Sequence, residues 1–144
     1  MKKILFVLLS IVFSLTACAD WQNIVGEKEL PLQAQTFIKT HFSMDDIALV
    51  EVEREKLHIE IQVYLKDGTE LDFDMQGNFL GIDCQTREVP AGIVPDVIEE
   101  YVKTNYAGLF IMEYNIENRY LQVELNNGLE LIFNLEGKFL RVDD

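Results

Sequence analysis

The feature that most constrains the fold of this chain is an internal duplication. Residues 30–42 (LPLQAQTFIKTHF) match residues 94–106 (VPDVIEEYVKTNY) at an offset of 64. Residues 67–80 (DGTELDFDMQGNFL) match residues 127–140 (NGLELIFNLEGKFL) at an offset of 60. The blocks occur in the same order, and a loop and a hairpin turn between them can absorb the four-residue difference. We therefore expect the same structural unit twice.

Each copy predicts a helix. Pro31 and Pro95 suit the first helical turn, where the fixed φ angle and the missing N–H of proline cost nothing. Apolar residues then recur at helical spacing, which predicts a buried face. These residues are Ala34, Phe37, Ile38 and Phe42 in the first copy, and Val97, Ile98, Tyr101, Val102 and Tyr106 in the second.

Alternating apolar and polar residues predict strands after each helix. Asp67-Gly68 and Asn127-Gly128 are typical of tight hairpin turns, in which a residue adopts a positive φ angle. The first strand of each copy is predicted around Val50 and around Tyr114, and the last strand carries Leu80 in one copy and Leu140 in the other.

The expected fold class is α+β, with two tandem units of one helix plus a four-stranded antiparallel sheet. The short connections favour antiparallel neighbours. One unit of about 55 residues would be marginally stable alone, so the two should pack or pair their sheets within one domain. We expect this domain over residues 29–144, with repeat one at 29–84 and repeat two at 88–144.

The N-terminus predicts export. Lys2 and Lys3 precede an apolar run from Ile4 to Leu15 that is too short for a membrane span. We expect a signal peptide over residues 1–18 and a linker over 19–28. Two forms of cleavage remain open: Leu15-Thr16-Ala17-Cys18 resembles a bacterial lipobox, which predicts lipidation of Cys18, whereas Ala17-Cys18-Ala19 also suits ordinary signal peptidase.

The charge and the cysteines exclude several classes of function. The chain carries −13, and removal of the signal deletes two lysines but no acid, which gives −15. Such a charge argues against a nucleic-acid partner and against charge-driven membrane adhesion, so a membrane is expected only through a lipid anchor. Loss or acylation of Cys18 would leave Cys84 without a disulfide partner, and we interpret Cys84 as a small apolar residue.

No catalytic, metal or cofactor site is predicted. His41 and His58 lie in no motif with a nucleophile or with metal-ligand spacing. The segment from Asp72 to Gly77 begins like a calcium loop, but its flanks are predicted strands and position 12 is Asp83 instead of glutamate. We interpret this segment as a β-turn.

The sheet face away from the helices is the expected binding surface. Strand alternation places a mixture of polar, aromatic and apolar side chains there, in which exposed aromatic rings can act as anchors. The candidate binding residues are Tyr64, Phe79, Tyr120, Ile132 and Phe139, with His58, Glu60, Gln62, Asp72, Gln122 and Glu124 around them.

These motifs resemble the periplasmic PepSY-like family, which is grouped by fold with β-lactamase-inhibitor-like proteins. The similarity rests on Leu30-Pro31 before the helix, on the helix ending at residues 37–42, and on the hairpin at 67–74 with the Gly-x-Phe that follows it. It extends from Glu29 to Asp144 and implies a non-catalytic binding module of the cell envelope.

We therefore expect an exported, periplasmic, non-enzymatic protein that recognises an envelope protein or peptide through its outer sheet face. The alternative is a protein that binds a small ligand or a cation, which the acidic charge favours.

Overall fold

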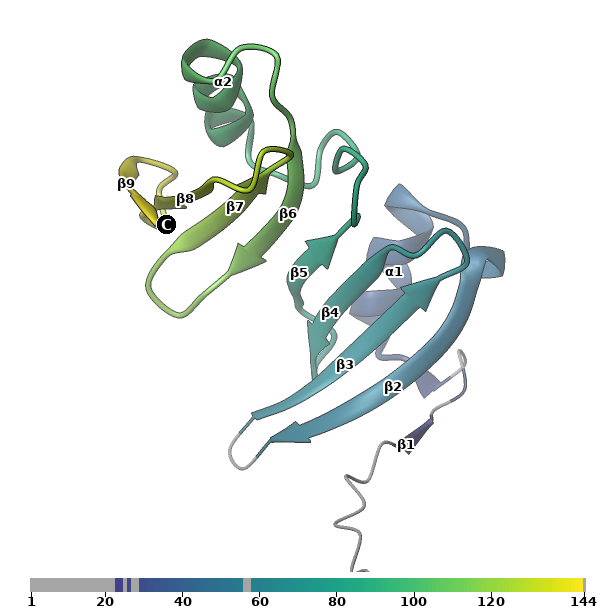
Figure 1. Ribbon diagram of the computed structural model, residues 1–144. Coiled ribbons are helices and arrows are strands. Elements are labelled where there is room, and N and C mark those ends of the chain that lie inside the picture. Colours follow the sequence, from purple (N-terminus) through teal and green to yellow (C-terminus); the bar gives the residue numbers. More distant parts are fainter. Residues whose placement is uncertain (1–22, 25, 27–28, 56–57, 144) are drawn as a thin grey trace, which may run out of the picture.

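The computed structural model describes residues 23–24, 26, 29–55 and 58–143 (Figure 1). The signal peptide and Cys18, and most of the expected linker, lie outside these residues. The side chains from Arg54 to His58 also lie outside the described part of the structure, and the expected outer-face position of His58 is among them.

The described chain folds into one antiparallel sheet with two helices, which confirms the predicted α+β class. The strands pair in sequence order from β1 to β9. The helices are α1 (Leu32–His41) and α2 (Asp96–Asn105), and a 3₁₀ helix, η2, covers Met44–Asp46. The strands are β1 (Asn23–Ile24), β2 (Ile47–Glu55), β3 (His58–Leu65), β4 (Glu70–Asp74), β5 (Phe79–Asp83), β6 (Ile111–Ile116), β7 (Leu121–Leu125), β8 (Glu130–Phe133) and β9 (Phe139–Asp143).

The two four-stranded segments, β2–β5 and β6–β9, join edge to edge in one sheet. β5 pairs with β6 through Gly81 and Asn115, Ile82 and Tyr114, and Asp83 and Glu113. Of the two arrangements that remained open, pairing of the sheets is therefore the one observed. In Figure 1, α1 lies behind β3 and β4, and the strands continue through β5 into β6.

The helices begin where the prolines indicate. Pro31 and Pro95 occupy the N-cap positions, one residue before the first helical residue. Gly77 in the β4–β5 turn has a φ of +85°, and a Cβ there would lie 2.7 Å from Pro31 Cβ. Glycine at this position therefore lets the turn pack directly on the start of α1.

One hydrophobic core fills the space between the helices and the sheet. Phe37 of α1 lies edge-to-face with Phe73, and Tyr101 of α2 lies edge-to-face with Phe133. Phe73 and Phe133 are both fully buried, and each contributes roughly 1.5–3 kcal/mol through burial. Cys84 is 2% exposed directly after β5, which agrees with its interpretation as a small apolar residue.

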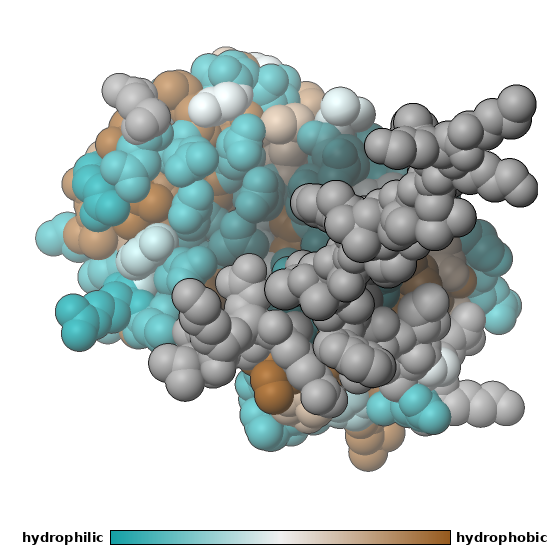
Figure 2. Space-filling model, turned by 60° about the horizontal axis from the view of Figure 1, so that its bottom comes forward, coloured by the Kyte–Doolittle hydropathy of each residue, from teal (hydrophilic) through white to brown (hydrophobic). Residues whose placement is uncertain are grey.

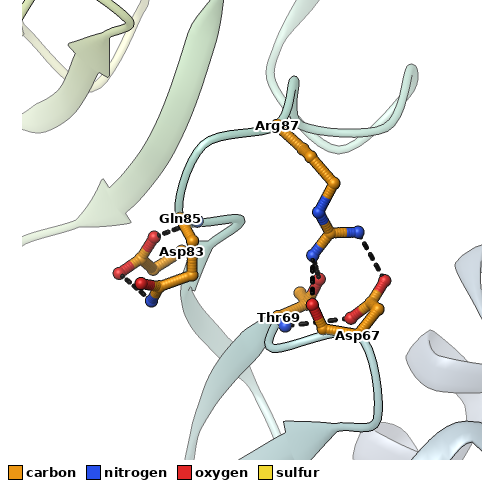
Figure 3. A network of polar contacts seen from close by, with 5 residues as sticks. All are labelled: Asp67, Thr69, Asp83, Gln85 and Arg87. Atoms are coloured by element: carbon orange, nitrogen blue, oxygen red, sulfur yellow. Dashed lines mark hydrogen bonds and ion pairs between the residues drawn. The ribbon is translucent and has the colours of Figure 1, made fainter.

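Arg87 ties the connection between β5 and α2 to the β3–β4 turn (Figure 3). Its guanidinium donates to Asp67 Oδ2 at 2.6 Å, to the Asp67 carbonyl at 3.0 Å and to Thr69 Oγ1 at 3.0 Å. These contacts lower the pKa of Asp67 to about 2.

Four β-bulges interrupt the alternation of the strands. In each, one residue has no partner on the neighbouring strand: Ala48 in β2, Leu80 in β5, Met112 in β6 and Leu140 in β9. A bulge reverses which face the following side chains occupy. The bulges therefore decide which residues reach the outer face of the sheet.

Candidate functional site: the outer face of the sheet

A continuous row of carboxylates crosses the outer face of the sheet, which is the face away from α1 and α2. Each member lies directly opposite the next on the adjacent strand. We call these residues the acidic row: Glu70, Asp83, Glu113, Glu124, Glu130 and Asp143. Tyr64 extends the row onto β3 by pairing with Glu70.

Repulsion between the carboxylates of the acidic row lowers the stability of the folded chain. Adjacent strands lie about 4.8 Å apart, and like charges directly opposite each other destabilise a sheet. Burial and neighbouring acids raise the pKa of Glu70 and of Glu113. A cation on this face would relieve the repulsion.

Neighbouring side chains hold several of the row carboxylates in place. Gln122 Nε2 donates to Glu130 Oε2 at 2.9 Å, and Asn115 Nδ2 donates to Glu113 Oε1 at 2.6 Å. Arg141 pairs with Asp143 at 3.0 Å at the sheet edge. Hydrophilic residues cover much of the described surface in the left half of Figure 2, with hydrophobic residues showing between them.

Asp72 lies in the middle of the next row on the same face. Its cross-strand partners are Gln62 on β3 and Gly81 on β5. The Asp72 Oδ1 atom is buried and accepts no hydrogen bond from the described residues. Burial, followed by the charges of Glu70, Glu60, Glu53 and Glu113, raises the pKa of Asp72 to about 7.

Asn115 lies across Gly81 from the opposite strand. A Cβ on Gly81 would clash with Asn115 Oδ1, so the missing side chain makes room for the amide of Asn115. Asp72 and Asn115 thus flank Gly81 from either side, since each is its direct cross-strand partner.

Tyr64 and Tyr120 keep their predicted place on or beside this face. Both are partly exposed. The Tyr64 hydroxyl donates to Gln62 Oε1 at 3.0 Å, and burial among Glu70, Glu51, Asp72 and Glu53 raises its pKa to about 12. Tyr120 lies in the β6–β7 turn, directly before β7.

The predicted outer-face position of Phe79 and Phe139 is wrong. Phe79 stacks on Phe37 of α1 with ring centroids 4.4 Å apart, and Phe139 stacks on Tyr101 of α2 at 4.8 Å. The cause is the bulge after each phenylalanine, at Leu80 and at Leu140, because strict alternation would have placed the rings on the other face.

Ile132 also fails as an exposed anchor. Its cross-strand partners are Gln122 and Arg141, as expected for the outer face, but the side chain is only 1% exposed. A partner could not reach it in this conformation.

The segment from Asp72 to Gly77 comprises the last three residues of β4 and the start of the β4–β5 turn, so the interpreted turn covers only its second half. Asp74 Oδ1 accepts hydrogen bonds from the backbone N–H groups of Gln76 and Asn78 at 2.8 and 2.9 Å. Asn134 makes the same bonds to Glu136 and Lys138 in the second turn. Asp74 is thus a turn-forming residue, and its Oδ2 atom also accepts a hydrogen bond from Asn78 Nδ2 at 2.7 Å.

Two cavities border the elements that carry these residues. One, of about 330 Å³, opens on the outer face beside Asp72, Asn115 and the β6–β7 turn. The other, of about 680 Å³, lies on the helix side between α2, residues 88–91 and residues 107–111, and it has a mostly apolar lining that includes Val89, Val94 and Val102.

Sequence reasoning missed most of the acidic row. Strand alternation predicts Glu124 on the outer face. The positions of the two hairpin turns would also have been enough to predict that Tyr64 lies opposite Glu70 and Glu124 opposite Glu130. Nothing local in the sequence indicates that β5 pairs with β6, which brings Asp83 opposite Glu113.

The described residues contain no group of three or more Asp, Glu, His or Cys side chains arranged to hold a metal ion. Within the same residues, no helix is long and apolar enough to cross a membrane.

Comparisons with known proteins identify relatives over most of the chain. Residues 59–141 match the family model described as "Putative beta-lactamase-inhibitor-like, PepSY-like". No curated protein matches the chain.

Three solved structures are similar in both fold and sequence. A Bacteroides thetaiotaomicron protein described as a "putative calcium-regulated periplasmic protein" is 33% identical with a TM-score of 0.82, and the match covers 88% of this chain and 99% of that one. A Bacteroides vulgatus protein described as a "putative periplasmic protein" of the DUF2874 family is 32% identical with a TM-score of 0.80, over 88% and 99% of the two chains. A second B. vulgatus protein, described as a "putative periplasmic protein of unknown function", is 32% identical with a TM-score of 0.80, over 85% and 99% of the two chains.

Proposed function

Because the chain belongs to the PepSY-like family, we propose that it is an exported, non-catalytic binding module of the periplasm that holds a cationic protein or peptide segment on its outer sheet face. The acidic row is the observation that carries this proposal. Six carboxylates across six adjacent strands weaken the unbound fold, and a positively charged partner would offset that cost.

The charge of the row replaces the aromatic anchors in this proposal. Of the five candidate binding residues, Tyr64 and Tyr120 stay as contacts at the margins of the face. Phe79 and Phe139 support the core, and Ile132 is buried. The partner is therefore defined by its positive charge.

Titration of a fluorescent ten-residue oligolysine peptide tests this function. We expect saturable binding that weakens as salt rises from 20 to 200 mM, because exposed charges are screened within about 10 Å at 0.1 M salt. Replacement of Glu113, Glu124 and Glu130 by glutamine should weaken binding by about tenfold, since each exposed charge pair contributes up to about 1 kcal/mol.

A matched variant separates the row from the bulk charge. The substitutions Glu88→Gln, Glu100→Gln and Glu136→Gln remove the same three charges from exposed positions outside the sheet. The proposal fails if this variant loses as much affinity as the row variant, or if oligolysine does not bind at all.

A second candidate is calcium binding on the same face. It is favoured by the relative described as calcium-regulated and by the buried oxygen of Asp72. Calorimetry with calcium and with magnesium at equal ionic strength tests it. Heat with calcium that disappears in the Asp72→Asn variant would support this candidate, and no heat at millimolar calcium would end it.

Export and the tandem repeat complete the proposal. We propose a signal peptide over residues 1–18, a linker over 19–28 and a domain over 29–144 with repeats at 29–84 and 88–144. Bulges at matching positions of the copies support the repeat: Ala48 and Met112 differ by 64, and Leu80 and Leu140 by 60. The mass of the mature N-terminus distinguishes an acylated Cys18 from ordinary cleavage.

A further inference from the structure

The 330 Å³ cavity on the outer face is lined by four carboxylates among amide and apolar side chains. Its lining includes the carboxylates of Glu60, Asp72, Asp74 and Glu117, together with Asn115. Glu60 and the two aspartates come from the β3–β4 hairpin, whereas Asn115 and Glu117 come from β6 and the turn after it. The cavity thus lies at the junction of the two four-stranded segments.

Asp72 is the lining residue that most favours a bound hydrogen-bond donor. Its Oδ1 atom is shielded from solvent and has no donor among the described residues, although a buried carboxylate oxygen normally accepts at least one hydrogen bond. The charges of the described residues that raise its pKa are acidic: Glu53 from β2, Glu60 from β3, Glu70 from β4 and Glu113 from β6. A donor for this oxygen must therefore come from outside these side chains.

The volume and the lining of the cavity favour an organic cation over a metal ion. The described residues include no metal-binding group of three acidic side chains, and 330 Å³ lies within the range of small-molecule pockets. An ammonium or guanidinium group offers several N–H donors, and in lysine and arginine side chains it lies at the end of an apolar stem. The stem could contact Leu80 and Ile116, which also line the cavity.

We infer that this cavity binds one ammonium or guanidinium group, of the kind carried by a lysine or arginine side chain, with Asp72 as its charged acceptor and Asn115 beside it. The inference rests on the proposed function, because it supplies an anchoring point for the cationic segment. Gly81 leaves room for the Asn115 amide beside the site, since a side chain at Gly81 would displace Asn115.

Binding should compete with a proton. The pKa of Asp72 is raised to about 7 by burial and by the surrounding acids, so a proton competes with a cation for its carboxylate near neutral pH. A cation binds the ionised form. Its affinity should therefore fall as the pH drops from 8 to 6.

Amide NMR on the full mature protein tests the site with small probes. Butylammonium and methylguanidinium should shift the signals of Gly81 and Asn115 in a saturable way. Tetramethylammonium has the same charge but no N–H donor, and it should shift them far less. Asp72→Asn and Gly81→Ala should each weaken binding by about 10- to 100-fold, which is the effect of losing a charge-assisted hydrogen bond.

Glu100→Gln is the matched control, because it removes one charge from an exposed position on α2, outside both the acidic row and the cavity lining. It should leave the affinity for butylammonium within about threefold, an effect typical of exposed charges. Equal shifts with tetramethylammonium, or equal losses in Glu100→Gln and Asp72→Asn, would overturn the inference. So would a response to calcium without any response to the amines.

The two proposals fail in different ways. If oligolysine binds the wild type but binds Asp72→Asn and Gly81→Ala equally well, the cavity is not an anchor and the acidic row alone suffices. If oligolysine does not bind the wild type, the proposed function itself is wrong.

Discussion

Asp72→Asn should stabilise the protein at pH 8, although it removes a native side chain. In the folded state the pKa of Asp72 is raised from 3.8 to about 7. Between about pH 4 and pH 7 the folded protein therefore binds more protons than the unfolded chain. Since the slope of the unfolding free energy with pH follows this difference, stability falls as the pH rises through that window.

The size of the effect follows from the shift. About three pKa units correspond to about 4 kcal/mol, which is an upper bound because Asp72 retains some solvent exposure. We expect the free energy of unfolding of Asp72→Asn to exceed that of the wild type by about 2–4 kcal/mol at pH 8. The two proteins should converge as the pH falls to about 4 and below, where Asp72 becomes protonated in the unfolded chain as it already is in the folded protein.

Urea unfolding followed by far-UV circular dichroism at pH 4, 6 and 8 measures this effect. Asp74→Asn is the control, because it removes the same charge from the same strand while asparagine can form the same turn, as Asn134 does. It should gain no stability at pH 8, because the hydrogen bonds from Asn78 and from the turn backbone lower the pKa of Asp74 and thus favour its ionised form in the folded state. The reasoning is refuted if wild type and Asp72→Asn show parallel pH profiles, or if Asp72→Asn is the less stable protein at pH 8.

Three further predictions concern the scaffold and can be measured by the same unfolding assay. Phe79→Ala should lower the free energy of unfolding by roughly 3 kcal/mol, because the ring packs against α1, and a smaller loss than 1 kcal/mol would return this residue to the surface. Arg87→Ala should cost about 1 kcal/mol, since its ion pair with Asp67 is half exposed, and the loss should shrink as the pH falls through the range from 4 to 2 that titrates Asp67. Gly137→Ala should lower the free energy of unfolding by roughly 1–3 kcal/mol more than Gly128→Ala. Both glycines have a positive φ, but only at Gly137 would the new methyl group press into α2, so equal losses would contradict the packing of that turn on the helix.

The sequence was sufficient for the elements whose causes are local. Proline before an apolar stripe located both helices, and the Asp-Gly and Asn-Gly turns located the hairpins, because each signal acts within a few residues. The helix-facing side of β4 and β8 followed from simple alternation at Leu71, Phe73, Leu131 and Phe133.

The bulges limited what alternation could predict. The apolar residues at Leu80 and Leu140 fit an uninterrupted strand, and only the contact of Phe79 and Phe139 with the helices favours a bulge there. This preference comes from tertiary packing, which a single sequence does not display. The outer-face assignment of both rings failed for that reason.

The candidate site depends on the same kind of long-range information. The acidic row needs the register of five strand pairs, and the cavity needs β5 beside β6, with Gly81 opposite Asn115. The sequence could place Asp72 on the outer face but could not show that its carboxylate is buried among other acids.

The central claim is that the outer sheet face binds positively charged partners, and amide NMR of the full mature protein during titration with the ten-residue oligolysine peptide tests it most directly. The account predicts that the shifted signals gather on the strands around the acidic row and the Asp72 cavity, and that α1 and α2 change little. Shifts concentrated at the cavity between α2 and residues 107–111, or spread evenly over the acidic surface, would contradict it.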